Sequence, residues 1–533
     1  MIDTKALRQK ILDLAIRGKL VPQDPDDEPA SVLLERIRQQ KQQMVKEGKL
    51  KPKDIKNDSV IFVGEDNLHY EKFSNGSVKC IEDEIPFGLP DGWAWVRLGN
   101  LSAAIQYGLS NSAEPQGTHR LLRITDIQDG KVDWNAVPFT TVNDPEAYLL
   151  KTGDIVFART GATVGKSFLI TETPYPSVYA SYLIRIRLLG SLSPEYIYQF
   201  FDSACYWSQI TDKSVGVGQP NCNGTSLKEL FIPLPPISEQ LRIVPTAQAL
   251  LAYVAKIDAE KKSLLSIIMA TKSKILDLAI RGQLIPQDPN DEPASVLLER
   301  IRAEKEELIK QGKIKRDKKE SVIFRGEDNS YYEKIGTEVY CIDEEIPFDI
   351  PDTWEWMRLE SCCIKEIRRG KSPKYIDESG TLVFAQKCNT RYSGIDVGLA
   401  LFLDENTLGR YPDDEYMQDG DVVINSTGTG TLGRVGIYHA TDNYLGLPIV
   451  PDSHVTIIRA ARSIQSVYLY GFMKANQSEL EKEGEGSTNQ KELKPLTLKE
   501  MLIPIPPYSE QERIVATITA AFSTISAIEN SLN

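Results

Sequence analysis

An internal repeat constrains this chain more than any other feature of its sequence. Residues 10–38, KILDLAIRGKLVPQDPDDEPASVLLERIR, return as residues 274–302 with three differences, at an offset of 264. Shorter matches follow in the same order, with SVIF at 59 and 321, GEDN at 64 and 326, and EIPF at 84 and 345. A closing block, SLKELFIPLPPISEQLRIV from Ser226, matches TLKEMLIPIPPYSEQERIV from Thr497 at an offset of 271. The sequence therefore predicts one structural frame that is used twice.

Between the matching blocks the two halves differ. From about 100 to 225 and from about 360 to 496 they share little beyond glycine-rich turns, GDIVFARTGATVGK at 153–166 and GDVVINSTGTGTLGR at 420–434. Short apolar runs predict many strands in each insert, with one or two helices such as 193–210. A constant frame around two different mixed α/β inserts is the pattern expected if one fold reads two different targets.

The two offsets also predict a closed arrangement. Under them Asn533 takes the position of Lys262 and Met1 that of Leu265, so the two chain ends together reproduce nearly all of segment 238–284. Apolar residues recur in that segment at heptad spacing, which predicts a helix of about 70 Å. The expected fold is α+β, with two mixed α/β domains separated by a pair of long antiparallel helices in a pseudo-twofold, cyclic arrangement. Pro245 predicts a kink or an irregular turn, and two unrelated helices that dock on separate cores are the alternative.

The repeat boundaries predict the order of domains. The predicted order begins with a helical region at 1–45, a duplicated linker segment at 46–98 and the first insert domain at 99–236. A central helical region at 237–308, the second linker segment at 309–359, the second insert domain at 360–507 and a helix at 508–533 follow. Basic stretches at 46–58 and 310–320 fit either solvated linkers or arms that touch phosphates. The sequence assigns no role to the acidic and aromatic segments around 59–95 and 321–356.

Composition excludes several classes of protein. The start of the chain lacks the apolar core of a signal peptide, and no apolar run of about 18 residues occurs, so we expect a cytoplasmic protein with no membrane partner. Seven cysteines without a C-x-x-C pair and four histidines predict reduced, structural thiols and no metal site. The formal net charge of -13 counts against DNA binding, although it says nothing of where the charges lie.

Motifs for catalysis are missing or imperfect. The run from Gly161 to Ser167 resembles a phosphate-binding loop, but three residues separate its glycines where that loop needs four. A second candidate, Gly370-Lys371-Ser372, has Lys365 in place of the first glycine. No motif for adenine methylation, no convincing nuclease carboxylates and no nucleophile elbow are found. We therefore expect a non-catalytic chain.

Three motifs, in this order and repeated twice, carry a resemblance to a known family. They are A-I-R-G-x-L at 15–20 and 279–284, G-D-[IV]-V in the inserts, and P-[LI]-P-P-x-x-E-Q-x-x-I-V at 233–244 and 504–515. Nearly the whole chain is similar to the DNA-specificity subunits of Type I restriction-modification systems. The resemblance implies a subunit that reads a bipartite site in double-stranded DNA through two target-recognition domains, with the helices as a ruler between them.

The same resemblance implies partners and cofactors. The specificity subunit would join two modification (methylase) subunits, which use S-adenosylmethionine, and restriction/translocase subunits, which use ATP and Mg2+. This chain would hold no cofactor of its own. A scaffold that binds only proteins, and a stand-alone DNA methyltransferase or nuclease, are the rival functions.

Candidate DNA-reading residues are amides, guanidinium groups, hydroxyls and lysines in or near glycine-rich loops, because such groups can contact base edges and phosphates. In the first insert they are Arg159, Thr160, Lys166, Gln219 and Asn221, and in the second Arg368, Arg369, Lys371, Asn425, Ser426, Thr427, Arg434, Asn489 and Gln490. For each one, a surface turn or a structural cap is the alternative. Trp93, Trp95, Trp354 and Trp356 lie in the duplicated frame, and we expect them to be core residues.

Overall fold

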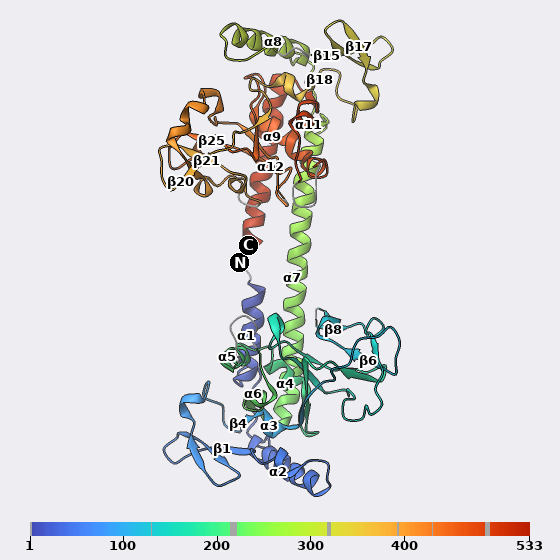
Figure 1. The fold of residues 1–533 in the computed structure, drawn as a ribbon, viewed down its shortest axis with the longest axis vertical. Coiled ribbons are helices and arrows are strands. Elements are labelled where there is room, and N and C mark those ends of the chain that lie inside the picture. Colours follow the sequence, from blue (N-terminus) through green and yellow to red (C-terminus); the bar gives the residue numbers. More distant parts are fainter. Residues whose placement is uncertain are drawn as a thin grey trace. The chain divides into compact units, whose positions relative to one another are not determined.

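The computed structural model describes residues 3–128, 130–213, 221–316, 321–391, 394–428, 430–484 and 491–532 (Figure 1). The chain divides into two units, Met1–Lys262 and Ser263–Asn533, and each is described by itself. The boundary lies within one long helix, α7, which spans Ile237–Ile280. Each unit therefore contains one copy of the duplicated frame and one insert.

The first unit alternates helices and strands. Its α-helices are α1 (Thr4–Ile16), α2 (Ala30–Lys46), α3 (Leu98–Leu101), α4 (Pro194–Phe200), α5 (Ala204–Lys213), α6 (Gly224–Lys228) and the first part of α7. Its strands are β1 (Ser59–Val63), β2 (His69–Phe73), β3 (Val78–Cys80), β4 (Ala94–Arg97), β5 (Ser102–Tyr107), β6 (His119–Leu122), β7 (Ile127–Gln128), β8 (Lys131–Val132), β9 (Phe139–Thr140), β10 (Ile155–Ala158), β11 (Ser167–Leu169), β12 (Ser177–Tyr179), β13 (Leu183–Leu188) and β14 (Phe231–Leu234). The helix expected at 193–210 is divided into α4 and α5.

The second unit repeats this order. Its α-helices after α7 are α8 (Ala294–Lys310), α9 (Ser466–Ala475), α10 (Gln477–Leu480), α11 (Pro495–Lys499) and α12 (Tyr508–Leu532). Its strands are β15 (Ser321–Arg325), β16 (Tyr331–Ile335), β17 (Glu338–Cys341), β18 (Glu355–Arg358), β19 (Arg368–Arg369), β20 (Tyr375–Ile376), β21 (Leu382–Phe384), β22 (Leu401–Leu403), β23 (Val422–Asn425), β24 (Val435–Ile437), β25 (Ile449–Pro451), β26 (Val455–Ile458) and β27 (Leu502–Ile505).

Equivalent strands build equivalent sheets in the two inserts. The first insert has an antiparallel sheet in the order β11–β10–β13–β5, and the second has one in the order β24–β23–β26–β19. A further sheet in each insert contains one parallel pair, β12 with β6 and β25 with β21. The predicted α+β fold with two mixed α/β domains is confirmed.

Each insert begins and ends at one strand pair. Strand β4, which leads into the first insert, pairs antiparallel with β14, which leads out of it, and places Trp95 opposite Pro233. In the second unit β18 and β27 pair in the same way, with Trp356 opposite Pro504. Because antiparallel pairing brings the two ends of the insert together, everything between them can differ while the frame stays the same.

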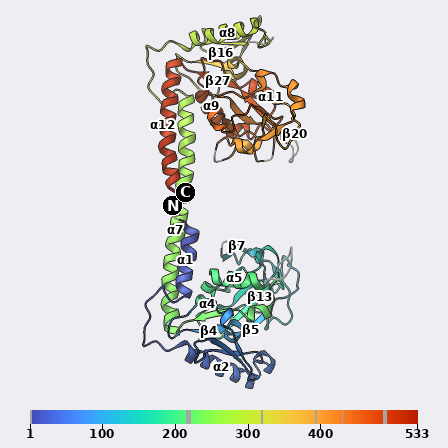
Figure 2. The same cartoon turned by 90° about the vertical axis from the view of Figure 1, so that its left-hand side faces the viewer.

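The long predicted helix is present, and a second helix packs against it within each unit (Figure 2). Helix α7 has 44 residues, which corresponds to about 66 Å. In the first unit α1 runs antiparallel to it, with Ile11 in a cluster with Ala247 and Val254. In the second unit Leu276 and Ala279 of α7 pack with Ile514 and Ile518 of α12.

Polar contacts also join the two helices of each pair at the end nearest the boundary between the units. The Thr4 hydroxyl donates to Asp258 at 3.1 Å in the first unit, and Lys272 pairs with Glu529 at 2.7 Å in the second. Helix α7 continues through Pro245, which removes one amide donor without ending the helix. The closed arrangement of the two halves stays a prediction.

A buried hydrogen bond joins each insert boundary to the long helices. The Trp93 indole donates to Glu239 at 2.8 Å, and the Trp354 indole donates to Glu510 at 2.9 Å. The four frame tryptophans are 1–9% exposed, so the prediction that they are core residues is confirmed. The S-E-Q sequence at the start of both α7 and α12 is therefore structural, since its glutamate is the acceptor for the indole.

Removal of this acceptor should destabilise the first unit. We expect Glu239→Ala to lower the free energy of unfolding by about 1–3 kcal/mol, because the buried Trp93 N–H loses the carboxylate that accepts its hydrogen bond. Hydrogen-exchange mass spectrometry of the full chain can measure this change on peptides around 231–247, and Glu260→Ala, on an exposed part of α7, is the control. Equal protection in the two variants would contradict the prediction.

The same glutamate should also make stability depend on pH. Burial raises the pKa of Glu239, although hydrogen bonds from Trp93 and Gln23 oppose the shift. A raised folded-state pKa stabilises the fold at low pH, and this contribution is lost as the pH rises through the folded value. Glu239→Gln cannot ionise, so its free energy of unfolding should vary less with pH between the ordinary carboxyl pKa and the raised one.

Candidate nucleic-acid interface

The glycine-rich turn of the first insert forms a closed loop between β10 and β11. Backbone hydrogen bonds from Ala158 N to Lys166 O (2.8 Å) and from Gly165 N to Ala158 O (3.1 Å) close its base. Gly165 has a φ of +90°, and a Cβ there would lie 2.5 Å from the ring of Trp207. The position therefore requires glycine, both for its backbone conformation and for its contact with α5.

Four of the predicted residues of this insert meet at the loop. Thr160 forms a β-bridge with Asn221, and Cys222 N donates to Arg159 O at 3.0 Å. The side chains of Thr160, Lys166 and Asn221 are exposed. Arg159 is half-buried, with its guanidinium 4.8 Å from the centre of the Tyr107 ring. Such a loop offers hydroxyl, amide and cationic groups to a ligand.

The second insert builds the same loop with different side chains. Asn425 N donates to Arg434 O at 3.0 Å, and Gly433 N donates to Asn425 O at 2.8 Å, which closes the loop between β23 and β24. Thr427 forms a β-bridge with Glu492, and its hydroxyl lies 2.7 Å from His454 Nδ1. Glu492 thus occupies the position that Asn221 holds in the first insert.

The structure places two of the predicted residues inside the protein. Asn425 and Ser426 are both 0% exposed. The Asn425 amide donates to Gln386 O at 3.1 Å and accepts from Asn389 at 3.3 Å, and the Ser426 hydroxyl lies 2.7 Å from that of Thr456. Both side chains are used within the domain, so in this structure they support the loop and are not part of its exposed surface.

The predicted cations of the second insert have acidic or carbonyl partners. Glu415, which is 2% exposed, lies 2.5 Å from Arg368 and 3.0 Å from Lys371. Burial would raise the pKa of Glu415, but the hydrogen bond from Arg368 and the charge of Lys365 lower it below its usual value. Arg369 pairs with Glu492 at 2.8 Å.

Arg434 donates to two backbone oxygens, those of Asn389 (2.7 Å) and Gly430 (3.2 Å). Its guanidinium is therefore held by the backbone of Asn389 and by that of its own loop. The remaining predicted residues, Gln219, Asn489 and Gln490, lie outside the described residues.

Sequence reasoning missed one residue at the end of β5, beside the first loop. Tyr107 is 40% exposed, lies under Arg159 and accepts a hydrogen bond from Gly224 N at 2.9 Å. It precedes Gly108, where a Cβ would lie 2.2 Å from Tyr179 O.

The second insert repeats this arrangement with Arg369 before Gly370, whose Cβ would lie 2.3 Å from Pro451 O. Comparison of the residues before these two glycines could have identified Tyr107 as the counterpart of the predicted Arg369.

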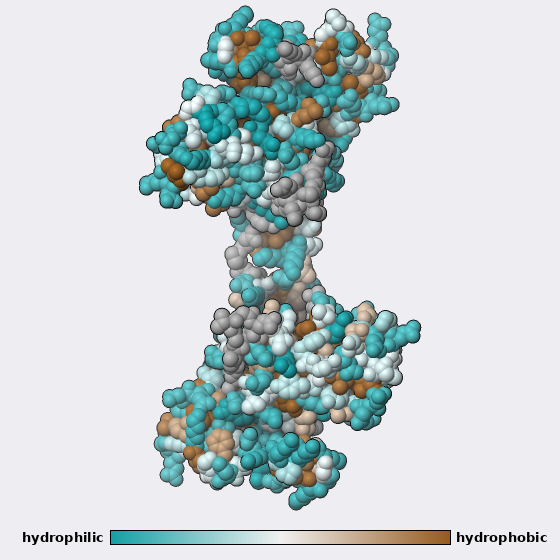
Figure 3. Space-filling model, in the orientation of Figure 1, coloured by the Kyte–Doolittle hydropathy of each residue, from teal (hydrophilic) through white to brown (hydrophobic). Residues whose placement is uncertain are grey.

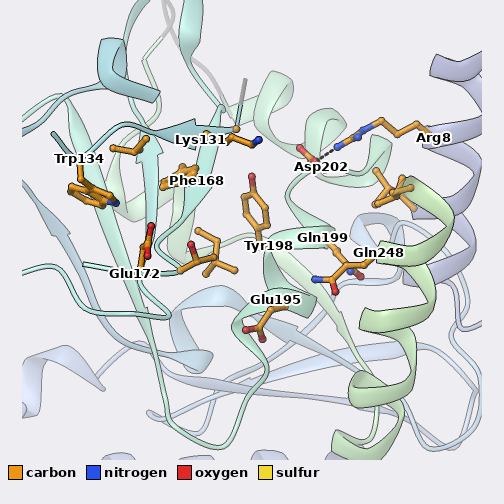
Figure 4. Close-up of a pocket in the computed structure, with 16 residues that line it drawn as sticks. Arg8, Lys131, Trp134, Phe168, Glu172, Glu195, Tyr198, Gln199, Asp202 and Gln248 are labelled. Atoms are coloured by element: carbon orange, nitrogen blue, oxygen red, sulfur yellow. Dashed lines mark hydrogen bonds and ion pairs between the residues drawn. The ribbon is translucent and has the colours of Figure 1, made fainter. Parts of the chain in front are cut away.

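A cavity of about 430 Å3 lies apart from the loop, between the first insert and the helices α1 and α7 (Figure 4). Trp134, Phe168 and Tyr198 line it, and Arg8 of α1 pairs with Asp202 at 2.8 Å at its edge. None of the predicted reading residues lines this cavity. The Arg8–Asp202 contact therefore joins the insert to the frame.

The negative charge of the chain is concentrated away from the loops. Residues 59–93 contain seven acidic and two basic side chains, and residues 321–354 contain nine and two, so these segments carry -12 of the formal net charge of -13. The rest of the chain is close to neutral, which removes most of the objection to DNA binding.

Neither a metal site nor a membrane segment is found in the part of the chain that the structure describes. No group of three or more His, Cys, Asp or Glu side chains in these residues could hold a metal ion. No helix among them is both long enough and apolar enough to cross a bilayer.

Comparison with known proteins identifies the family. The family model described as "Type I restriction modification DNA specificity domain" matches residues 90–267 and again residues 351–533. The chain therefore belongs to the Type I restriction-modification DNA-specificity family, as the resemblance predicted, and carries two copies of its domain.

Two similar proteins are specificity subunits of the same class. The chain is 26% identical to the Type I restriction enzyme EcoEI specificity subunit of Escherichia coli, over 99% of this chain and 90% of the relative. It is 29% identical to the EcoAI specificity subunit of Escherichia coli, over 67% and 62%.

A solved structure described as "Structural basis underlying complex assembly and conformational transition of the type I R-M system" shares the fold. Its TM-score is 0.51 at 20% identity, over 84% of this chain and 94% of that one.

Buried and exposed loop residues should respond differently to substitution. We expect Asn425→Ala to lower the free energy of unfolding by about 1–3 kcal/mol, because Asn389 loses an acceptor and Gln386 O a donor. Lys166→Ala, at an exposed position, should change it by less than about 0.5 kcal/mol. Chemical denaturation measures both. An Asn425→Ala variant that keeps its stability but discriminates less between bases would contradict this prediction and would indicate that Asn425 contacts DNA.

Proposed function

We propose that this chain reads a bipartite DNA site, with each insert recognising one half-site through the loop after β10 or β23. One observation carries the proposal: the two loops share backbone geometry but differ in side chains. The bridge from Thr160 to Asn221 is matched by that from Thr427 to Glu492. Side chains that differ on a common scaffold would distinguish different bases.

Roles within each loop follow from exposure and charge. Thr160 and Asn221 are exposed groups that can form hydrogen bonds to base edges, and Lys166 suits a phosphate. In the second insert the candidates are Thr427 of the loop itself, and Arg369 and Lys371 at and just after β19. Arg369 and Lys371 have carboxylate partners here, so DNA would have to compete with Glu492 and Glu415 for them.

The chain would act as the non-catalytic part of a larger enzyme. Its partners would be double-stranded DNA, two modification subunits and restriction/translocase subunits. S-adenosylmethionine would belong to the modification subunits, and ATP and Mg2+ to the restriction subunits. Membership in the specificity family supports this assignment, and a cytoplasmic location would follow from it.

Two rival functions make different predictions. A scaffold that binds only proteins would leave DNA unbound even when the modification subunits are present. A stand-alone methyltransferase or nuclease would turn over DNA as the purified chain. Polar side chains that are exposed on the first loop and half-buried on the second favour DNA reading over the first rival. The imperfect catalytic motifs disfavour the second.

Exchange of one insert tests the proposal. Replacement of residues 100–225 by the insert of a related subunit should change one half of the methylated motif and leave the other unchanged, because each insert is bounded by its own strand pair. The reciprocal replacement of residues 360–496 is the matched control and should change only the other half. Methylation mapping in cells reads out both. A change in both halves, or in neither, would contradict the proposal.

A further inference from the structure

Each unit contains a small three-stranded antiparallel meander that the two inserts do not use. The meanders are β1–β2–β3 and β15–β16–β17, within the duplicated segments to which the sequence assigned no role. Their inner faces account for their attachment. Ile61 packs with Trp95 and Phe231 in the first unit, and Ile323 packs with Trp356 in the second.

An ion pair in each unit stabilises the attachment of the meander to β4 or β18. Arg97 contacts the buried Glu71 at 2.7 Å, and Arg358 contacts the buried Glu333 at 2.6 Å. Burial would raise the pKa of Glu71, but its hydrogen bonds from Arg97 and Ser59 lower it below its usual value. Each meander is thus fixed to β4 or β18 through one side of its sheet.

The opposite side, here called the outer face, is mostly apolar and carries one exposed lysine in each copy. The strand registers place Val60, Phe62, Tyr70, Lys72, Val78 and Cys80 on this face in the first unit, and Val322, Phe324, Tyr332, Lys334, Val339 and Cys341 in the second. Phe62 is 41% exposed and Phe324 39% exposed. Figure 3 shows hydrophobic residues at the surface where Figure 1 places β1 and β17.

All six positions of the outer face have the same residue in both copies. The geometry is also the same, since Phe62 stacks on Tyr70 and Phe324 on Tyr332 with ring centres 5.9 Å apart. On the inner strand faces, four of seven paired positions differ, and two of these are exposed in both copies, Val63 against Arg325 and Lys79 against Tyr340. Exposed positions usually tolerate substitution better than packed ones. Fold stability therefore does not explain why the exposed face is the one that is identical.

The charge near this face indicates which kind of partner would bind to it. Asp66 accepts from the Tyr70 hydroxyl at 2.7 Å, and Asp328 accepts from that of Tyr332 at 2.8 Å, so a carboxylate lies at the edge of each outer face. The segments 59–93 and 321–354, which contain the meanders, hold -12 of the formal net charge of -13, most of it in the stretches that follow β3 and β17. DNA would be repelled, whereas a protein surface with an apolar centre and a basic rim would be complementary.

We propose that the two outer faces are docking sites for two copies of one protein subunit, each of which presents an apolar patch rimmed by basic side chains. The same face presented twice fits the same subunit bound twice. The inference rests on the proposed function, in which the subunit present in two copies is the modification subunit. It assigns a role to the duplicated segments that is separate from DNA reading.

The two exposed cysteines make the proposal testable in the unaltered chain. Cys80 and Cys341 lie on the outer faces, whereas Cys205 is half-buried and Cys222, Cys362, Cys363 and Cys388 are buried. N-ethylmaleimide labelling, followed by peptide mass spectrometry, would be compared with and without the saturating modification subunit. We expect labelling of both Cys80 and Cys341 to slow by about tenfold or more in the complex, with Cys205 as the internal control.

The outcomes separate this inference from the function on which it rests. If a complex forms that methylates DNA while either exposed thiol reacts at its original rate, the inference is wrong and the proposed function stands. If no complex forms with the modification subunit, the proposed function fails and the inference fails with it. If the chain alone self-associates and protects both thiols, a second copy is the occupant and the inference is wrong.

Variants supply an independent measurement. Phe62→Glu and Phe324→Glu should each weaken the binding of one modification subunit by at least about tenfold in native mass spectrometry, and the double variant should weaken both. Leu445→Glu, at a residue 44% exposed in the second insert, is the matched control. Unchanged binding of two copies by a double variant with unchanged circular dichroism would overturn the proposal. Loss of only the restriction subunit would overturn it as well.

Discussion

The antiparallel pairing of the strands that enter and leave each insert is the constraint on which the rest of the structure depends. Strands β4 and β14, and β18 and β27, bring the ends of each insert to one place in the frame. The adjoining Trp93 and Trp354 indoles then fix that place to the start of α7 and α12 through Glu239 and Glu510. An insert attached in this way can change its loops without any change in the frame that holds it.

The two reading loops show the consequence of this constraint. Gly165 and Gly433 close their loops with the same backbone hydrogen bonds, yet Asn221 stands where the second insert has Glu492. An amide both donates and accepts, whereas a carboxylate only accepts. Equivalent backbones therefore present different hydrogen-bonding groups, which is what two readers of different half-sites require. The acidic segments 59–93 and 321–354 lie elsewhere in the frame and carry -12 of the formal net charge of -13.

Much of the fold could be predicted from the sequence because duplication and periodicity are local patterns. The heptad spacing identified α7, and the position of the tryptophans in the repeated frame identified them as core. The site was harder to predict, because a polar residue near a glycine-rich turn can point either way from a strand. Asn425 ends β23 and is buried against Asn389, which is 36 residues away in the sequence. The partner of Arg368, Glu415, lies 47 residues away, and no pattern in the sequence connects the two.

The central claim is that one frame carries two different readers, and a methylation map tests it most directly. Adenine methylation would be sequenced in cells that express this chain with its modification subunit, and in cells that lack the chain. The account predicts a single motif with two short specified elements separated by an unspecified spacer of constant length, and its loss when the chain is absent. A continuous motif without a spacer, or methylation that persists without the chain, would contradict the account.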